Sequence, residues 1–379
     1  AVPQATGIAI LGDVFVSALK AIAPLLVFFL VVSSLCNAGK SHGGVIKTVI
    51  ILYMFSTVLA AVIAVFASMA FPVKMTLANA ATDTSAPQGI VEVLNNLLLN
   101  VVANPVSSLV NANYVGILMW AVLLGLAFRA ADKMTKKVLA DVADGISMVV
   151  TWIINLAPFG IFGLVFNTVS TNGLDIFTTY GKLLILLVGC MLFIYFVTNP
   201  LLVYWCIRQN PYPLIFHCLK RSALTAFFTR SSAANIPVNM KVCEEMGLDR
   251  DTYSVTIPLG ATINMDGAAI TITVMTMATA FTLGIHVDIP TAIILSLLAA
   301  LSACGASGVA GGSLLLIPMA CSLFGISDDI SMQVVAVGFI IGVVQDSVET
   351  ALNSSSDLLL SASAEFRQWR LEGKEIKFK

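Results

Sequence analysis

Long apolar runs separated by short polar segments dominate the first half of the chain. Each run has the roughly 20 residues that a helix needs to cross the hydrocarbon core of a membrane. The runs lie at 8–36, 45–71, 91–128, 146–169 and 183–205. The run at 91–128 is too long for one span, and Asn104, Pro105 and Ser107 predict a break inside it, because proline removes a backbone donor and clashes with the preceding turn.

The second half has a different pattern, in which clusters of small and polar residues interrupt the apolar segments. These clusters lie at 229–235, 264–267, 302–313 and 345–357. Full spans are predicted at 253–282 and 330–361. Because no segment resembles a soluble domain, the fold class predicted is an all-α polytopic membrane protein.

Composition and charge exclude several function classes. Hydrophobic residues make up 58% of the chain and charged residues only 11%, against roughly 25% charged in soluble domains. The net charge of −1 offers no basic surface for nucleic acid. The seven cysteines are scattered singly, without a CxxC pair, so neither a disulfide framework nor a zinc site is indicated.

The distribution of Lys and Arg predicts the topology, since short cytoplasmic loops accumulate these residues. With Arg230 left out, sixteen of the 20 fall into four clusters, at 40–47, 129–137, 208–250 and 367–379. With all four inside, the C-terminus is cytoplasmic. The segments at about 211–250 and 289–326 must then be re-entrant hairpins, entered from inside and outside respectively. Each precedes one full span, which makes an inverted repeat typical of secondary transporters.

The final span carries four polar side chains on one face. Asp346, Glu349, Asn353 and Asp357 fall within about 80 degrees of arc on a helical wheel, and Thr350 borders them. Ionisable groups at membrane depth usually face a cavity, an ion or one another. A solvated helix end would explain Asp357 but not a stripe of three turns.

The span before it contains the segment Gly260 to Gly267, which includes Asn264 and Asp266. Glycine weakens a helix, and Asn and Asp offer its backbone other hydrogen bonds. We therefore expect local unwinding, with freed carbonyls and side-chain oxygens forming a cage for a small hard cation. A kink with Asp266 bonded to nearby backbone is the structural alternative.

The predicted hairpin tips, 230–235 and 305–312, are rich in Ser, Gly and Ala, which allows close approach and leaves helix ends facing the cavity. Tight turns alone would explain Gly305 and Gly308. They would not explain Arg230, which needs a partner at membrane depth, with Asp346 or Glu349 as candidates. Tyr53, Ser56 and Thr57 share a helix face, a pattern that helix packing also explains.

Four segments give the sequence a resemblance to a known family. Residues 229–237 (TRSSAANIP), 259–267 (LGATINMDG), the 305–312 tip and 346–357 (DSVETALNSSSD) closely resemble the dicarboxylate/amino acid:cation symporters, the glutamate transporter homologues. The resemblance runs from about Gly12 to the end. The family's first span has no counterpart, because 12–36 resembles the second.

The resemblance implies a homotrimer in the plasma (inner) membrane of a bacterium, with a static scaffold and a transport domain that moves as an elevator. We expect residues 1–43 and 84–170 to form the scaffold and trimer contacts. Residues 44–83 and 171–365 would form the transport domain, and 366–379 a cytoplasmic tail.

Carried over by position, the resemblance implies a substrate site and three sodium sites. Asp346 would bind the substrate amino group and Asn353 its carboxylate, with Ser231, Ser232, Thr350 and the backbone of Val309 around it. One sodium site would comprise Gly260, Asn264, Asn353 and Asp357. A second would use backbone carbonyls of Thr262, Ala303, Cys304 and Ala306, and a third Tyr53, Ser56, Thr57, Asn264 and Asp266. The order Ser56 then Thr57 is reversed relative to some members.

Two departures from the family bear on the substrate. Dicarboxylate carriers place an arginine where Glu349 stands and a threonine where Ala268 stands. Because a carboxylate repels an acidic substrate in a poorly solvated pocket, we predict a neutral substrate. Glu349 can accept a hydrogen bond from a hydroxyl, as in the sodium-coupled serine/threonine symporters that this sequence resembles.

Three other functions remain as alternatives. A sodium-coupled carrier for acidic amino acids or dicarboxylates belongs to the same family. An intramembrane aspartyl protease would use Asp266 and Asp357, although no GxGD motif occurs, and it would need the two carboxylates to share a proton. An anion channel would lack saturable, sodium-dependent uptake.

Overall fold

The computed structural model describes residues 7–37, 44–77, 99, 102–111, 113–172, 176–304, 306 and 311–376. Every regular element in these ranges is helical, as the apolar pattern predicted. Four helical stretches there are long and apolar enough to cross a membrane. They are Gly44–Ala70, Thr178–Ile207, Arg250–Thr282 and Asp328–Leu371.

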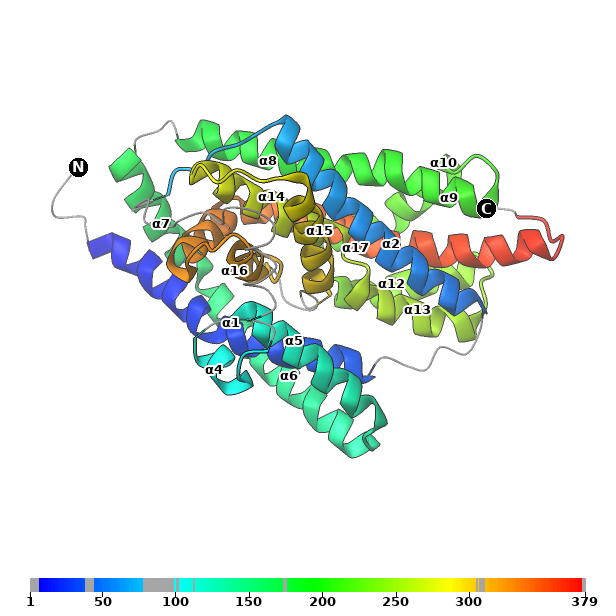
Figure 1. Ribbon diagram of the computed structural model, residues 1–379. Helices are drawn as coiled ribbons and strands as arrows, with labels where there is room; N and C mark the ends of the chain where they lie inside the picture. The colour runs from blue at the N-terminus through cyan, green and yellow to red at the C-terminus, as the bar shows by residue number, and fades with distance from the viewer. Residues whose placement is uncertain are drawn as a thin grey trace.

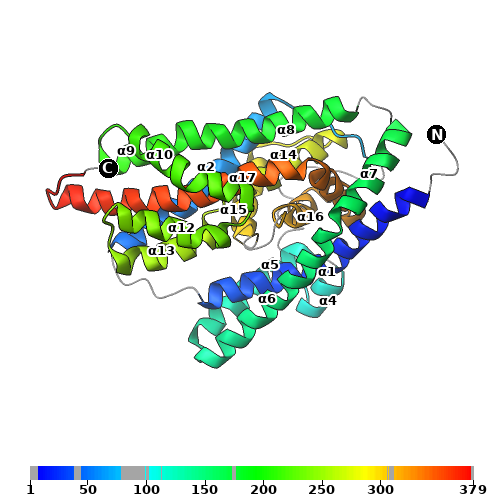
Figure 2. The same cartoon turned by 180° about the vertical axis from the view of Figure 1, so that it is seen from behind.

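The first group of helices packs around α1 (Ala9–Asn37), which contacts α5 (Tyr114–Ala127), α6 (Lys133–Asn155) and α7 (Ala157–Asn172). Helices α5 and α6 lie in the lower part of the molecule in both views, whereas α7 runs up along the side where α1 begins (Figures 1 and 2). The expected break before α5 is confirmed: Asn104 caps α4 (Pro105–Val110), and Asn113 caps α5. The prediction of a single span at 146–169 is wrong, because α6 ends at Asn155 and α7 begins at Ala157. Pro158 follows and has no N–H with which to continue α6.

The second group surrounds α17 (Asp328–Leu371), a helix of 44 residues and thus about 66 Å long. Helix α2 (Gly44–Ala70) contacts α14 (Asp266–Thr282), α15 (Ile289–Ala303) and α17. On another side of α17 lie α8 (Ile176–Phe193), the π-helical turn η3 (Ile194–Thr198) and α9 (Asn199–Ile207). At its far end, Arg370 Nε donates to the carbonyl of Cys206, which fixes α17 to α9.

The first predicted hairpin is present as a helix, a turn and a helix. Its first arm comprises α10 (Tyr212–Cys218), the π-helical turn η4 (Leu219–Ala223) and α11 (Leu224–Thr229). Its second arm is α12 (Ser232–Glu245), which contacts α11 and α17. The turn lies at Arg230, whose φ of 50° is left-handed, and at Ser231, so the tip is shorter than the predicted 230–235.

The second predicted hairpin comprises α15, the 3-10 turn η5 (Leu314–Leu316) and α16 (Ile317–Ser322). Gly305, Gly308 and Val309, which were expected at its tip, lie outside the described residues. Near the end of the predicted tip, Gly311 has a φ of +71°, and a side chain there would also approach the ring of Phe339. The element order is therefore a hairpin followed by a long helical stretch, twice.

Helix α13 (Arg250–Ile263) and α14 together form the stretch that follows the first hairpin, and the predicted unwinding lies between them. Asn264 and Met265 leave helical geometry, with φ/ψ of −96°/79° and −119°/49°. This confirms that the Gly-Asn-Asp segment interrupts a buried apolar helix. The break lies beside the polar face of α17, since α17 contacts both halves.

Candidate functional site

The break between α13 and α14 redirects backbone groups toward neighbouring elements. The N–H of Met265 donates to Thr57 Oγ1 at 3.2 Å, and the N–H of Gly267 donates to Asn353 Oδ1 at 2.7 Å. In an uninterrupted helix these groups would bond the carbonyls of Ala261 and Ile263. Two carbonyl oxygens thus lose their helical partners at one buried place.

The four polar residues of α17 are buried. Glu349, Asn353 and Asp357 pack against the break, whereas Asp346 faces Arg230 and the second hairpin. Asp346, Glu349, Asn353 and Asp357 are between 1% and 6% exposed. Thr350, at 7% exposed, lies among them. The close packing requires Gly267, because a Cβ there would stand 3.0 Å from the Glu349 backbone.

The first set of residues expected to bind sodium comes together around Asp357. Asn264 Nδ2 donates to Asp357 Oδ1 at 2.9 Å and to the Asn353 carbonyl at 3.4 Å. The side-chain amide oxygen, Asn264 Oδ1, is buried and has no hydrogen-bond partner among the described residues. Gly260 faces the same place, since a Cβ on it would lie 2.8 Å from Asp357 Oδ1. An unpartnered oxygen beside a buried carboxylate fits a cation ligand set.

A second set surrounds Asp266. Ser56 Oγ donates to Asp266 Oδ2 at 2.7 Å, and Thr57 Oγ1 lies 3.2 Å from Asp266 Oδ1. The hydroxyl of Tyr53 points elsewhere, toward the Asp357 carbonyl at 2.9 Å. Tyr53 therefore reaches this set through its backbone carbonyl, which accepts from Thr57 Oγ1 at 3.0 Å.

The remaining expected set lies between α15 and the end of α13. Cys304 Sγ is 3.8 Å from the carbonyl of Ile263, the residue after Thr262. Ala306 N donates to the Ala303 carbonyl at 2.9 Å. This set is therefore next to the helix break, whereas the Thr262 hydroxyl bonds the Leu259 carbonyl.

The residues expected to bind substrate are contributed by both hairpins and α17. Arg230 Nε lies 4.0 Å from Asp346 Oδ2, so of its two predicted partners it pairs with Asp346. From the second hairpin, the N–H of Gly311 donates to Asp346 Oδ1 at 3.1 Å. Ser231, which caps α12, and Ser232 are half-buried beside Arg230.

Sequence reasoning missed the side chains that hold Glu349. Thr271, Ser313 and Gln345 all donate to Glu349 Oε2, at 2.7, 2.9 and 2.5 Å. Gln345 precedes Glu349 by one helical turn, a spacing that could have suggested it. Thr271 and Ser313 come from α14 and the second hairpin, and nothing in their local sequence marks them.

A second missed cluster fixes the first hairpin to α17. Asn239 Nδ2 donates to the Ser354 carbonyl, and Asn235 Nδ2 donates to Ser354 Oγ, each at 2.8 Å. Ser222 Oγ bonds Asn239 Oδ1 from the other arm. All four residues are fully buried or nearly so, which positions the arms of the hairpin next to Asn353.

The site as a whole is acidic and rich in oxygen. Asp266, Asp346, Glu349 and Asp357 contribute four carboxyl groups, and within the described residues Arg230 supplies their one ion pair. No cluster of three His, Cys, Asp or Glu suited to a metal ion occurs in that part of the chain. Carbonyl, amide and carboxylate oxygens are ligands for hard cations and for an ammonium group.

The two aspartates do not form a protease pair. Asp266 accepts from Ser56 and lies 3.2 Å from Thr57 Oγ1, whereas Asp357 accepts from Asn264. Among the hydrogen bonds of the described residues none joins the two carboxylates, as a proton shared by an aspartyl protease pair would.

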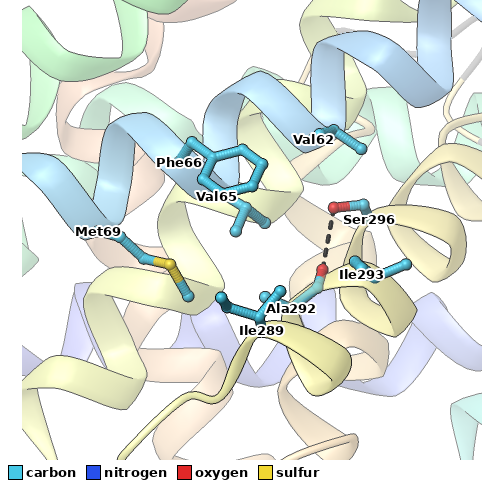
Figure 3. A pocket seen from close by; sticks show the side chains of 8 residues that line it. All are labelled: Val62, Val65, Phe66, Met69, Ile289, Ala292, Ile293 and Ser296. Atoms are coloured by element: carbon cyan, nitrogen blue, oxygen red, sulfur yellow. Dashed lines mark hydrogen bonds between the residues drawn. The ribbon is translucent and has the colours of Figure 1, made fainter.

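A separate small pocket lies between α2 and α15 and does not belong to the site. Its lining is apolar except for Ser296, whose hydroxyl donates to the Ala292 carbonyl at 2.9 Å (Figure 3). The residues that line it are Val62, Val65, Phe66, Met69, Ile289, Ala292, Ile293 and Ser296. Since this hydroxyl donates within its own helix, the lining is suited to an apolar group rather than to a polar ligand.

Comparison with known proteins agrees with the resemblance stated from the sequence. The sodium:dicarboxylate symporter family matches residues 3–365. The serine/threonine transporter SstT of Bifidobacterium adolescentis is 59% identical over 375 residues, which cover 99% of this chain and 87% of that protein.

Proposed function

Because the chain belongs to the sodium:dicarboxylate symporter family, we propose that it takes up serine or threonine by coupling their entry to that of sodium. As a member of this family it is a membrane transporter and not an enzyme. The observation that carries the choice of substrate is Glu349, a buried carboxylate where dicarboxylate carriers have an arginine. The similarity to a serine/threonine transporter supports the same choice.

Repulsion by Glu349 is large enough to exclude acidic amino acids. Two like charges 4 Å apart repel by about 4 kcal/mol at an effective dielectric constant of about 20. That energy corresponds to roughly a thousandfold in affinity. Arg230 lies beside Asp346 rather than Glu349, so no described cation offsets this repulsion.

The amino acid backbone would bind between α17 and the two hairpin tips. Asp346 would accept the ammonium group. Among the described residues, Asn353 Nδ2 donates only to Met265 Sδ, at 3.5 Å. Because this sulfur is a weak acceptor, the amide can donate to the substrate carboxylate. Thr350, Ser231, Ser232 and the backbone of Val309 would close around the substrate.

Sodium would bind at the three oxygen-rich sets. In the first, Asn264 Oδ1 and Asp357 would face the ion, together with the carbonyls of Gly260 and Asn353. In the set around Asp266, Ser56 and Thr57 would turn their protons away from the carboxylate as the ion arrives. In the set next to α15, the ligands would be the backbone carbonyls of Thr262, Ala303, Cys304 and Ala306.

Alternating access would follow the elevator mechanism of the family. The helices around α17 would form the moving transport domain, and those around α1 the scaffold that forms a homotrimer. The hairpin of α15 and α16 would act as the outer gate. The protein would lie in the inner membrane of a bacterium, with its C-terminus on the cytoplasmic side.

The test is transport by the purified protein in proteoliposomes. An inward sodium gradient should drive accumulation of labelled serine, and unlabelled serine and threonine should compete better than alanine or aspartate. Uptake that follows a proton gradient alone would refute sodium coupling. Preference for aspartate would refute the substrate assignment.

A further inference from the structure

The carboxylate of Glu349 is held by one of its two oxygens. Three donors converge on Oε2, from Thr271, Ser313 and Gln345. The other oxygen, Oε1, has no hydrogen bond to any described residue and is not among the buried unpartnered atoms. The carboxylate is therefore fixed in direction, with Oε2 held by three donors and Oε1 free of hydrogen bonds to the described part of the chain.

The hydrogen bonds around Thr271 also determine where its hydroxyl proton points. Gln345 Nε2 donates to Thr271 Oγ1 at 2.8 Å as well as to Glu349. Since Thr271 accepts from Gln345, its own single proton is committed to Glu349 Oε2. Gln345 thus makes Thr271 a donor toward the carboxylate.

We propose that Thr271, Ser313 and Gln345 are the residues that set the preference for a hydroxylated substrate, by presenting Glu349 Oε1 to the substrate hydroxyl. This inference rests on the proposed function and names the groups that make its pocket selective. Without the three donors the carboxylate would rotate, and the pocket would no longer offer an acceptor at a fixed place.

Ser313 gives this arrangement a second consequence. Ser313 belongs to the second hairpin, and the N–H of Gly311, two residues earlier in the same segment, donates to Asp346. The hairpin therefore contacts both carboxylates of α17 that would bind the substrate, Asp346 and Glu349. The hydroxyl of Ser313 thus completes, from the hairpin, the set of donors that orients Glu349.

The experiment compares inhibition constants for serine and alanine, measured as competition against sodium-driven uptake of labelled serine. Ser313→Ala and Thr271→Val should each weaken serine binding by about fivefold, the size expected for one lost hydrogen bond. Alanine should change by less than about twofold, so the serine-to-alanine preference falls. Thr271→Ser, which keeps the hydroxyl, should retain the wild-type preference.

Thr279→Val is the matched control. Thr279 is a buried threonine of the same helix, and its hydroxyl donates to the Met275 carbonyl, away from Glu349. The preference should be unchanged in this variant. Ser313→Ala removes a single oxygen atom, so it decides the matter if Thr271→Val fails to fold.

Two results would overturn the inference. One is a parallel rise in the inhibition constants of serine and alanine, which a merely structural role would give. The other is an unchanged preference in Ser313→Ala and Thr271→Val. Failure of the proposed function is seen separately, because the wild-type protein would then show no sodium-driven serine uptake at all.

Discussion

Replacing Gly260 by alanine adds a single methyl group and tests the proposed sodium ligands around Asp357. A Cβ at this position would lie 2.8 Å from Asp357 Oδ1 and 2.9 Å from the Tyr53 hydroxyl. Neither neighbour can move freely. Asp357 is held by Asn264, and the Tyr53 hydroxyl bonds both the Asp357 carbonyl and Ser361. The methyl group must therefore displace the carboxylate or the helix that carries it.

The magnitude follows from the overpacking of a tight site, which costs about 1 to 3 kcal/mol. If that strain is relieved by moving Asp357 away from the ion, sodium affinity should fall by roughly 5- to 150-fold. Folding should suffer less, because alanine stabilises a helix interior by about 0.5 to 1 kcal/mol relative to glycine.

The assay is a sodium titration of serine uptake in proteoliposomes, with protein in detergent titrated in parallel by sodium-dependent thermal stabilisation. Gly342→Ala is the control, because it lies within α17 and a Cβ there would meet nothing within 4 Å. Wild-type sodium dependence in Gly260→Ala, with the protein folded, would refute the assignment of this set to sodium.

Three further predictions address the other groups of the site. Asp266→Asn and Asp357→Asn should each weaken sodium-dependent serine uptake, since each removes a negative charge from a proposed ligand set; half-saturating sodium concentrations equal to wild type would count against this. Glu349→Arg should lower serine affinity and begin to admit aspartate, because the repelling charge becomes an attracting one; competition curves that still exclude aspartate would contradict it. In a protein without the other cysteines, the rate at which a membrane-impermeant thiol reagent labels Cys304 should change when sodium and serine are added. Identical labelling rates in all conditions would argue against a gate at this hairpin.

The sequence alone determined the membrane class and most of the helices. Apolar runs of spanning length have no stable place in water, so an all-helical membrane protein was predicted and the family match agrees. Asn264 and Asp266 in an apolar helix predicted the break that the structure has, because their side chains compete for backbone hydrogen bonds. The spacing of Asp346 to Asp357 predicted a shared face through the helical period alone.

The family resemblance supplied what local patterns could not, namely which residues should meet. The structure brings Asn264, Asp357 and Gly260 together across two helices, and Ser56 and Thr57 to Asp266 across two others. Their roles in binding remain predictions. The Tyr53 hydroxyl does not bond Asp266, because it bonds the Asp357 carbonyl and the Ser361 hydroxyl instead.

Only the tertiary structure decided how Glu349 is held. Its donors come from positions 271, 313 and 345, and two of the three are on other elements. Thr271 and Ser313 are ordinary helix and turn residues by any local measure, since a hydroxyl reveals its partner only when packing brings it near. The same holds for Asn235 and Asn239, whose bonds to Ser354 join segments more than a hundred residues apart in sequence. The helical period predicts only which residues of one helix share a face, whereas the orientation of a buried carboxylate depends on every element packed against it.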